Sequence, residues 1–401
     1  MSVKQEFNIS VFFKWLVLVV IISIAAGSLS ALFLSLLNWA TQYHEHHRRL
    51  IYCLPLAGLS VGLLYQYWGQ DTGRGNGLVF DTIHDPKEAI PFRMTPLVLL
   101  GTVATHLFGG SAGREGTALQ MSAAAADQLY KPFKLDRQGR SILLIAALSG
   151  GFSSVFGTPL AGAIFGMEVL FVGMVPYRAI LPALSCAFLS AWITGLWGVG
   201  HTNYQIGVIP ELKFSLLLFS LLAGAAFALA AVLFVKLTHL MTAAFNKIFY
   251  APLRPFAGGI IVLLLVLLPG MYQYTGLGIP QILESFQQIS APQDFALKIL
   301  LTAITLGAGF KGGEVTPLFF IGATLGSALS LFLPLPTGLL AGMGFVAVFA
   351  GAAKTPIACT VMALELFGFP CAAYVAIACA VSYFLSGKHS IYNPKFAKQF
   401  L

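Results

Sequence analysis

The residues of this chain best suited to chemistry are two glutamates, each set in a short motif that occurs twice. The two copies are Gly113-Arg114-Glu115-Gly116-Thr117 and Gly312-Gly313-Glu314-Val315-Thr316. A threonine-proline pair followed at equal spacing by glutamate also recurs, from Thr158-Pro159 to Glu168 and from Thr355-Pro356 to Glu365. These recurrences predict two repeats, residues 1–205 and 206–401, that form one domain, and glycine-broken repeats that carry glutamates in so apolar a chain are typical of membrane transporters.

Glu115 lies between apolar segments, where a carboxylate is costly unless it has a function. Such a carboxyl group can carry a proton. A structural ion pair with Arg114 is the competing interpretation, and we disfavour it because neighbouring residues on a helix do not face each other. The glycines on either side fit a helix N-terminus, whose free amides bind anions.

Asn76 and Thr316 could donate hydrogen bonds to an anion. The simpler interpretations are a turn for the asparagine-glycine pair and an N-cap for the threonine. Phe80 is more typical of packing than of a pathway, and Tyr392 alone would indicate an aromatic anchor at a membrane surface. Glu314, the second acidic group, begins a helix that continues with Pro317.

The other polar features favour structural interpretations. Glu168 and Glu365 stand within apolar segments, and their repetition favours backbone hydrogen bonds at an interface between the repeats. His44-Glu45-His46-His47 lacks metal-site spacing and is interpreted as a solvated loop. We expect no metal or other cofactor.

The composition is that of a membrane protein that crosses the bilayer several times. The 401 residues are 57% hydrophobic and 9% charged, whereas soluble domains average about 25% charged residues. Trp15 to Leu37 is long enough to be a first membrane helix rather than a cleaved signal peptide. The net charge of +8 is assigned to membrane topology, not to nucleic-acid binding. One basic loop, with Lys131, Lys134, Arg137 and Arg140, is expected to face the cytoplasm, and the five cysteines are expected to be buried and unpaired.

The apolar segments must position these groups, and several are shorter than the roughly 20 residues that cross a bilayer. They predict an all-α protein of tilted and broken helices, whose ends in mid-membrane must be buried in protein or line a watery cavity. The segments are 15–37, 51–68, 95–108, 117–130, 141–155, 159–175, 178–199, 214–236, 256–274, 295–310, 317–333, 337–353, 355–368 and 369–386.

On these residues the chain resembles the CLC family of anion channels and proton-coupled anion antiporters, over nearly its whole length. The motif around Glu115 is similar to the one that carries the family's gating glutamate. Gly313 to Pro317 resembles the glycine-x-phenylalanine-x-proline motif, and Gly75 to Leu78 replaces the family's glycine-serine-glycine-isoleucine-proline. Gly276 to Pro280 imitates that last motif but lies in the second half, so we interpret it as the repeat partner.

The departures from the family's usual pattern resemble its bacterial fluoride/proton antiporter branch. Thr117 replaces a proline, Asn76 replaces the serine that binds chloride, and Val315 replaces a phenylalanine. Val169 stands where chloride exchangers often have a second glutamate. The resemblance therefore implies a multi-pass protein of the bacterial inner membrane, a homodimer, that exports fluoride in exchange for protons.

The same resemblance implies Glu115 as the gating and proton-carrying residue. The anion-binding residues that it implies are Gly75, Asn76, Gly77, Phe80, Gly113, Arg114, Gly116, Thr117, Val315, Thr316 and Tyr392. A chloride/proton antiporter and a passive anion channel of the same fold are the alternatives. An enzyme is disfavoured because the apolar segments offer few histidines or aspartates for catalysis.

Overall fold

The computed structural model describes residues 9–85, 89–170 and 177–392, and within them the chain is helical. The helices are α1 Ile9–His46, α2 Leu54–Leu64, α3 Asn76–His84, α4 Met94–Leu107, α5 Glu115–Asp127, α6 Arg137–Phe156, α7 Pro159–Glu168, α8 Ile180–Leu196, α9 Phe214–Phe245, α10 Leu253–Val266, α11 Ile279–Ser285, α12 Asp294–Gly307, α13 Val315–Leu329, α14 Thr337–Ala353, α15 Pro356–Phe367 and α16 Ala372–Leu385. Short 3-10 turns include η3 Gln70–Arg74 and η5 Met271–Tyr274. The all-α prediction is confirmed.

Helix length separates elements that can cross a bilayer from elements that end within the protein. Among the described residues, five helical segments are long and apolar enough to cross a membrane, including α1 and α9. By contrast, α3, α5 and α13 have 9, 13 and 15 residues, fewer than the roughly 20 needed to span. Glu115 and Thr316 lie in the first turns of α5 and α13, so these short helices begin at the centre of the protein.

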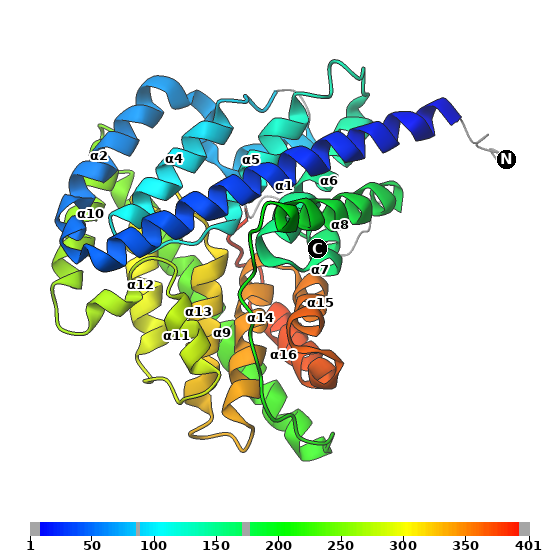
Figure 1. The fold of residues 1–401 in the computed structure, drawn as a ribbon. Coiled ribbons are helices and arrows are strands. Elements are labelled where there is room, and N and C mark those ends of the chain that lie inside the picture. The colour runs from blue at the N-terminus through cyan, green and yellow to red at the C-terminus, as the bar shows by residue number, and fades with distance from the viewer. Residues whose placement is uncertain (1–8, 86–88, 171–176, 393–401) are drawn as a thin grey trace.

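The two halves of the chain lie against each other, as Figure 1 shows, with the blue to cyan helices gathered on one side and the yellow to orange helices on the other. Contacts between the halves include α2 with α10 and α7 with α15. Helices α9, α13 and α14 pack together in the second half. Residues 199–213 carry no helix and connect α8 to α9.

Backbone hydrogen bonds join the halves where their repeated motifs meet. Gly113 N–H donates to the Gly313 carbonyl at 2.6 Å, and Gly313 N–H donates to the Gly113 carbonyl at 2.8 Å. A β-carbon on Gly113 would lie 2.8 Å from the Gly313 oxygen, so the approach requires glycine there. This isolated bridge fixes the starts of α5 and α13 relative to each other.

Stacked phenylalanines fill the core behind this bridge. The rings of Phe319 and Phe345 lie 3.9 Å apart, and Phe319 also contacts Phe156 from the first half at 5.2 Å. The ring of Phe152 lies 4.2 Å from Phe165. These rings exclude water from the region behind the helix starts and hold α6 against α13 and α14.

The glutamates of the threonine-proline motifs bind backbone across the repeat interface, as predicted. Glu168 accepts hydrogen bonds from the amides of Ile357 and Ala358 at 3.0 and 2.7 Å. Glu365 accepts from Leu160 and Ala161 at 2.9 and 2.8 Å. Each carboxylate thus satisfies the free amides at the start of the other half's helix, α15 or α7.

A Glu365→Gln variant is expected to be less stable. A glutamine keeps one acceptor, but its NH2 group cannot accept the second amide hydrogen bond, which costs about 1 kcal/mol. We expect a lower midpoint of thermal unfolding in detergent, and Glu211→Gln, an exposed change outside the helices, should leave the midpoint in place. Equal midpoints for Glu365→Gln and the parent protein would show that the paired contact is not stabilising.

Four local predictions require correction. His44 to His46 form the last turn of α1 rather than a loop, and His44 is only 5% exposed. Arg140 is buried and forms an ion pair with Asp127 at 2.7 Å, so it is not part of the exposed basic loop that was predicted. Cys53 is exposed, whereas the other cysteines are buried. Helix α7 ends at Glu168, and residues 171–175 of the predicted 159–175 segment lie outside the described residues.

Candidate functional site

The Glu115 carboxylate is fully buried and is held by donors from both halves of the chain. Its Oε1 accepts a 2.5 Å hydrogen bond from the Thr316 hydroxyl. Its Oε2 accepts from the backbone amides of Thr316 and Arg114 at 3.0 and 3.1 Å. These hydroxyl and amide donors at two helix starts are the groups that would bind a small anion.

Arg114 contributes through the ion pair that the sequence argument disfavoured. Its Nε lies 3.6 Å from Glu115 Oε1, so the two neighbours do form an ion pair. The argument failed because Arg114 is the N-cap residue, outside the regular helix, where side chains of adjacent residues can turn toward each other. Arg114 therefore adds positive charge to the site that holds the carboxylate.

A cavity of ≈ 510 Å³ lies beside this group and is lined by six of the predicted residues. Those six are Gly75, Asn76, Gly77, Phe80, Glu314 and Tyr392. The cavity is not lined by Glu115, Thr316, Gly113, Arg114, Gly116, Thr117 or Val315. Since Gly312 and Glu314 do line it, the cavity ends next to the loop that receives the carboxylate.

Asn76 is the first residue of α3, and its side chain reaches the start of α5. Gly75 before it has φ 57°, a left-handed conformation that glycine adopts readily. A β-carbon on Gly116 would lie 3.1 Å from the Asn76 side-chain nitrogen, so the amide group is adjacent to the first turn of α5. Asn76 is therefore positioned between the cavity and the Glu115 helix.

Phe80 and Tyr392 close one wall of the cavity. Their rings meet edge to face with centroids 5.1 Å apart, and both side chains are nearly buried. The Tyr392 hydroxyl is buried and has no hydrogen-bond partner in the described part of the chain. It is a donor that an anion in the cavity could use.

Two predicted residues lie behind the site rather than in the cavity. The Thr117 hydroxyl is 2.7 Å from the Thr102 hydroxyl of α4, so it is already engaged. Val315 is fully buried. The segment from Gly276 to Gln281, which leads into α11, lines a different cavity, so the Asn76 loop and its repeat counterpart face separate spaces.

The structure also reveals cavity residues that the motifs did not indicate. Lys311 lines the cavity, and its ammonium lies 4.0 Å from the centre of the Tyr65 ring. Gln120 lines the cavity too, one turn into α5, with its amide nitrogen 3.3 Å from where a Gly75 β-carbon would be. The position of Lys311 directly before the Gly312-Gly313-Glu314 motif could have indicated it as a cavity residue. No feature of the sequence indicated Gln120.

Known proteins are similar to this chain in sequence and in fold. The model of the family described as voltage gated chloride channel matches residues 57–387. A protein of Pseudomonas syringae pv. tomato named "Chloride/fluoride channel protein" is 50% identical over 387 residues, which cover 95% of this chain and 86% of that protein.

Two further relatives are named as an antiporter and an exchange transporter. A crystal structure of a CLC-type fluoride/proton antiporter superposes with a TM-score of 0.93 and 34% identity, and the match covers 97% of this chain and 99% of that one. The H(+)/Cl(-) exchange transporter ClcA of Vibrio vulnificus is 28% identical over 336 residues, 78% of this chain and 70% of that protein.

Proposed function

The chain belongs to the voltage-gated chloride channel (CLC) family, and from this premise we propose that it exports fluoride in exchange for protons. Two relatives support fluoride as the anion, because the names of both proteins include it. The second of these relatives is named as a fluoride/proton antiporter, which supports exchange against protons. The chain is a transporter rather than an enzyme.

The observation that carries the proposal is that one carboxylate takes donors from both repeats. Fluoride is small and strongly hydrated, so a site must replace its water with hydrogen-bond donors. The amides of Arg114 and Thr316 and the Thr316 hydroxyl are such donors, and the helix dipoles of α5 and α13 favour negative charge. Glu115 and fluoride thus compete for the same groups.

Competition of this kind couples the movement of fluoride to the movement of protons. While Glu115 is a carboxylate it occupies the donors, and an anion cannot bind there. When it gains a proton, the carboxyl group is neutral, releases the donors and moves, and fluoride from the cavity takes its place. Return of the carboxylate then requires that fluoride and the proton leave on opposite sides, so one is exported as the other enters.

Other cavity residues have supporting roles in this scheme. Asn76 and Tyr392 would donate to fluoride in the cavity, and the positive charge of Lys311 would attract it. Glu314, at the start of α13, would handle a second proton or order water. We further propose that the protein is a homodimer in the bacterial inner membrane and that its repeats are residues 1–205 and 206–401.

Purified protein in lipid vesicles provides the test. Vesicles that contain less fluoride than the outside solution are placed under an inward proton gradient, and fluoride release is followed with an ion-selective electrode. We expect proton flow to drive fluoride against its own gradient, with much weaker transport of chloride. Equal chloride transport would identify a chloride/proton antiporter, and fluoride leakage that no pH gradient can drive would identify a passive channel.

A further inference from the structure

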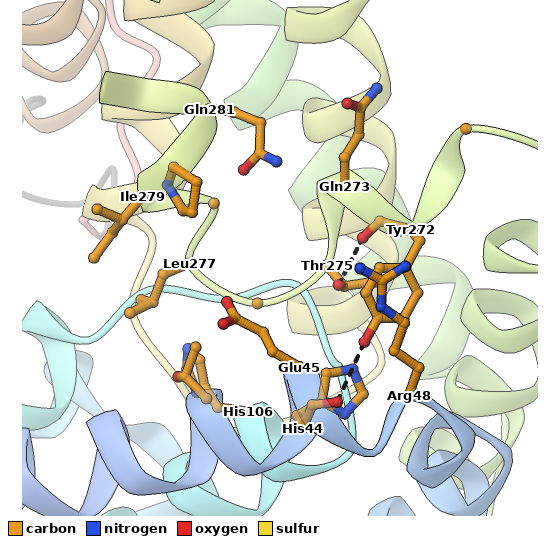
Figure 2. A pocket seen from close by; sticks show the side chains of 15 residues that line it. His44, Glu45, Arg48, His106, Tyr272, Gln273, Thr275, Leu277, Ile279 and Gln281 are labelled. Atoms are coloured by element: carbon orange, nitrogen blue, oxygen red, sulfur yellow. Dashed lines mark hydrogen bonds between the residues drawn. The ribbon is translucent and has the colours of Figure 1, made fainter. Parts of the chain in front are cut away.

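A second cavity, of ≈ 590 Å³, lies on the second repeat's counterpart of the Asn76 loop. Figure 2 shows it between the end of α1 and the segment from Gly276 to Gln281, which leads into α11, with Glu45 extending from α1 into its middle. It shares no lining residue with the cavity beside Glu115. Since the scheme above does not use it, its polar lining needs a separate explanation.

The two cavities are built from corresponding parts of the repeats. Gly75, Asn76 and Gly77 line one, and their counterparts Gly276, Leu277 and Gly278 line the other. The end of α9 lines the first cavity and the end of α1 lines the second.

The ends of α4 and α12 also correspond, but with a change of residue. Thr102 and Thr105 of α4 have the counterparts Thr302 and Thr305 in α12, so His106 corresponds to Leu306. His106 lines the second cavity and Leu306 lines the first. The second cavity therefore has a titratable group where the first has an apolar one.

Both ring nitrogens of His106 face carbonyl oxygens. Nδ1 lies 2.8 Å from the Thr102 oxygen, and Nε2 lies 3.1 Å from the Ala112 oxygen. A neutral imidazole has one N–H and can donate to only one carbonyl, whereas the imidazolium ion donates to both. The shorter contact retains the single N–H of the neutral ring, so the contact with Ala112 depends on a second proton.

Ala112 belongs to the loop that positions the gating carboxylate. The next residue, Gly113, forms the backbone bridge with Gly313, and the amide of Arg114 donates to Glu115 at 3.1 Å. We propose that His106 is a positioning residue for Glu115. A proton taken from the second cavity lets Nε2 of His106 donate a hydrogen bond to the Ala112 carbonyl, which holds the loop in place. This inference rests on the proposed proton-coupled function and adds a site of proton control to it.

The charged and titratable groups around this ring are of both signs. Lys298 and Arg114 are close enough to act on it electrostatically. The cavity itself is lined by further groups, namely His44, Glu45, Arg48 and Tyr272. The Lys298 ammonium is held by the carbonyls of Tyr274 and Gly276 at 3.0 and 2.8 Å, so it is part of the loop and not a free partner for the ring.

The direction of the effect follows from the hydrogen bonds. The protonated ring holds the Ala112 carbonyl and keeps the Glu115 loop fixed, which slows the movement of the carboxylate. The neutral ring turns a lone pair toward that carbonyl and loosens the loop. Proton-driven fluoride transport should therefore include a component that falls as pH falls through the titration of His106.

The test compares His106→Gln with the parent protein in vesicles, at a fixed pH difference and a series of absolute pH values. Glutamine can donate to one carbonyl but does not titrate in this range. In His106→Gln, we expect transport no longer to fall as the pH falls. At the acid end of the series the variant should be about tenfold faster than the parent protein, which corresponds to the free energy of one charge-assisted hydrogen bond. A profile scaled by the same factor at every pH would show a merely structural role and overturn the proposal.

His47→Gln is the matched control. His47 lies just beyond the end of α1, its ring contacts the Tyr43 carbonyl and the Tyr43 ring of the preceding turn, and it does not line the cavity. Its pH profile should superpose on that of the parent protein. If the parent protein shows no proton-driven fluoride transport, the proposed function fails; if it does and His106→Gln follows its profile, only this inference fails.

Hydrogen exchange of the unmodified protein gives a second measurement that does not depend on a variant folding. Peptides that contain residues 109–114 are followed by mass spectrometry from neutral pH to well below about pH 6.5, where an unperturbed imidazole titrates, because the His106 ring is buried and burial disfavours its charged form. After correction for intrinsic exchange rates, we expect their protection to increase as pH falls. Protection that does not change with pH would contradict the proposal.

Discussion

A Glu115→Gln variant is expected to lose proton-driven fluoride transport completely while remaining folded. The glutamine has nearly the same shape as glutamate but cannot bind and release a proton. Its carbonyl oxygen can still accept the 2.5 Å hydrogen bond from the Thr316 hydroxyl. Its NH2 group, however, would face the amides of Thr316 and Arg114, which are themselves donors.

Because of this mismatch, the variant should also differ from the parent protein in how it passes fluoride. The neutral side chain holds the donors less firmly than a carboxylate, so fluoride should still bind and cross passively. In vesicles, we expect fluoride to run down its own gradient while an imposed pH gradient drives no uphill movement. A pH electrode should record no proton movement that accompanies fluoride.

The control for this variant is Glu211→Gln, which changes an exposed glutamate in the connection between α8 and α9. It removes the same charge without touching the site, and its coupled transport should match that of the parent protein. Uphill fluoride transport by Glu115→Gln at the parent rate would assign the proton to another group, and Glu314 in the neighbouring cavity would be the next to test.

The repeated motifs were sufficient to predict which residues converge at the centre of the protein. Glycine, glutamate and threonine that recur in both halves indicate two helix starts, and two repeats that bury their starts must bring them together. The predicted match is displaced by one residue in the structure, because Glu115 is the first residue of α5 whereas Glu314 is the N-cap of α13 and Val315 is its first residue. The Glu115 contacts with Thr316 agree with this reasoning. The contacts of Glu168 and Glu365 were predictable for a similar reason, because a half-buried acid within an apolar helix and without a basic partner must find backbone donors.

Contacts that depend on side-chain direction in three dimensions could not be predicted. The rule about neighbours on a helix did not apply to Arg114, because the helix starts one residue later. Arg140 looked like part of a basic loop, although the buried Asp127 that pairs with it lies thirteen residues earlier in the chain. His44 looked solvated because its sequence neighbours are polar, but its own ring packs parallel to Tyr272 at 5.6 Å.

The residues that line the cavity could not be predicted from the sequence either. Asn76, Phe80 and Tyr392 share a wall although they come from opposite ends of the chain. The motif around Glu115 placed Thr117 in the same anion site, but its hydroxyl is engaged with Thr102. A motif identifies residues on one loop, whereas a cavity is defined by which of their side chains face the same space.

An Asn76→Ser variant is expected to lose most of the preference for fluoride over chloride. The Asn76 amide reaches the first turn of α5 and offers two N–H donors, which suit a small anion with a high charge density. Serine is shorter and offers one donor, so the site becomes wider and replaces less of the water around fluoride. Loss of one hydrogen bond to a charged group corresponds to about a tenfold fall in the selectivity ratio.

The selectivity ratio is measured as the initial rate of proton-driven fluoride release divided by the corresponding rate for chloride, in vesicles of matched protein content. Asn203→Ser is the control, because Asn203 is exposed in the stretch between α8 and α9 and does not line the cavity. Both variants retain Glu115, so each should keep its proton coupling. An unchanged ratio in Asn76→Ser would move selectivity to the donors around Glu115, where the Thr316 hydroxyl is the group that the carboxylate itself binds at the shortest distance.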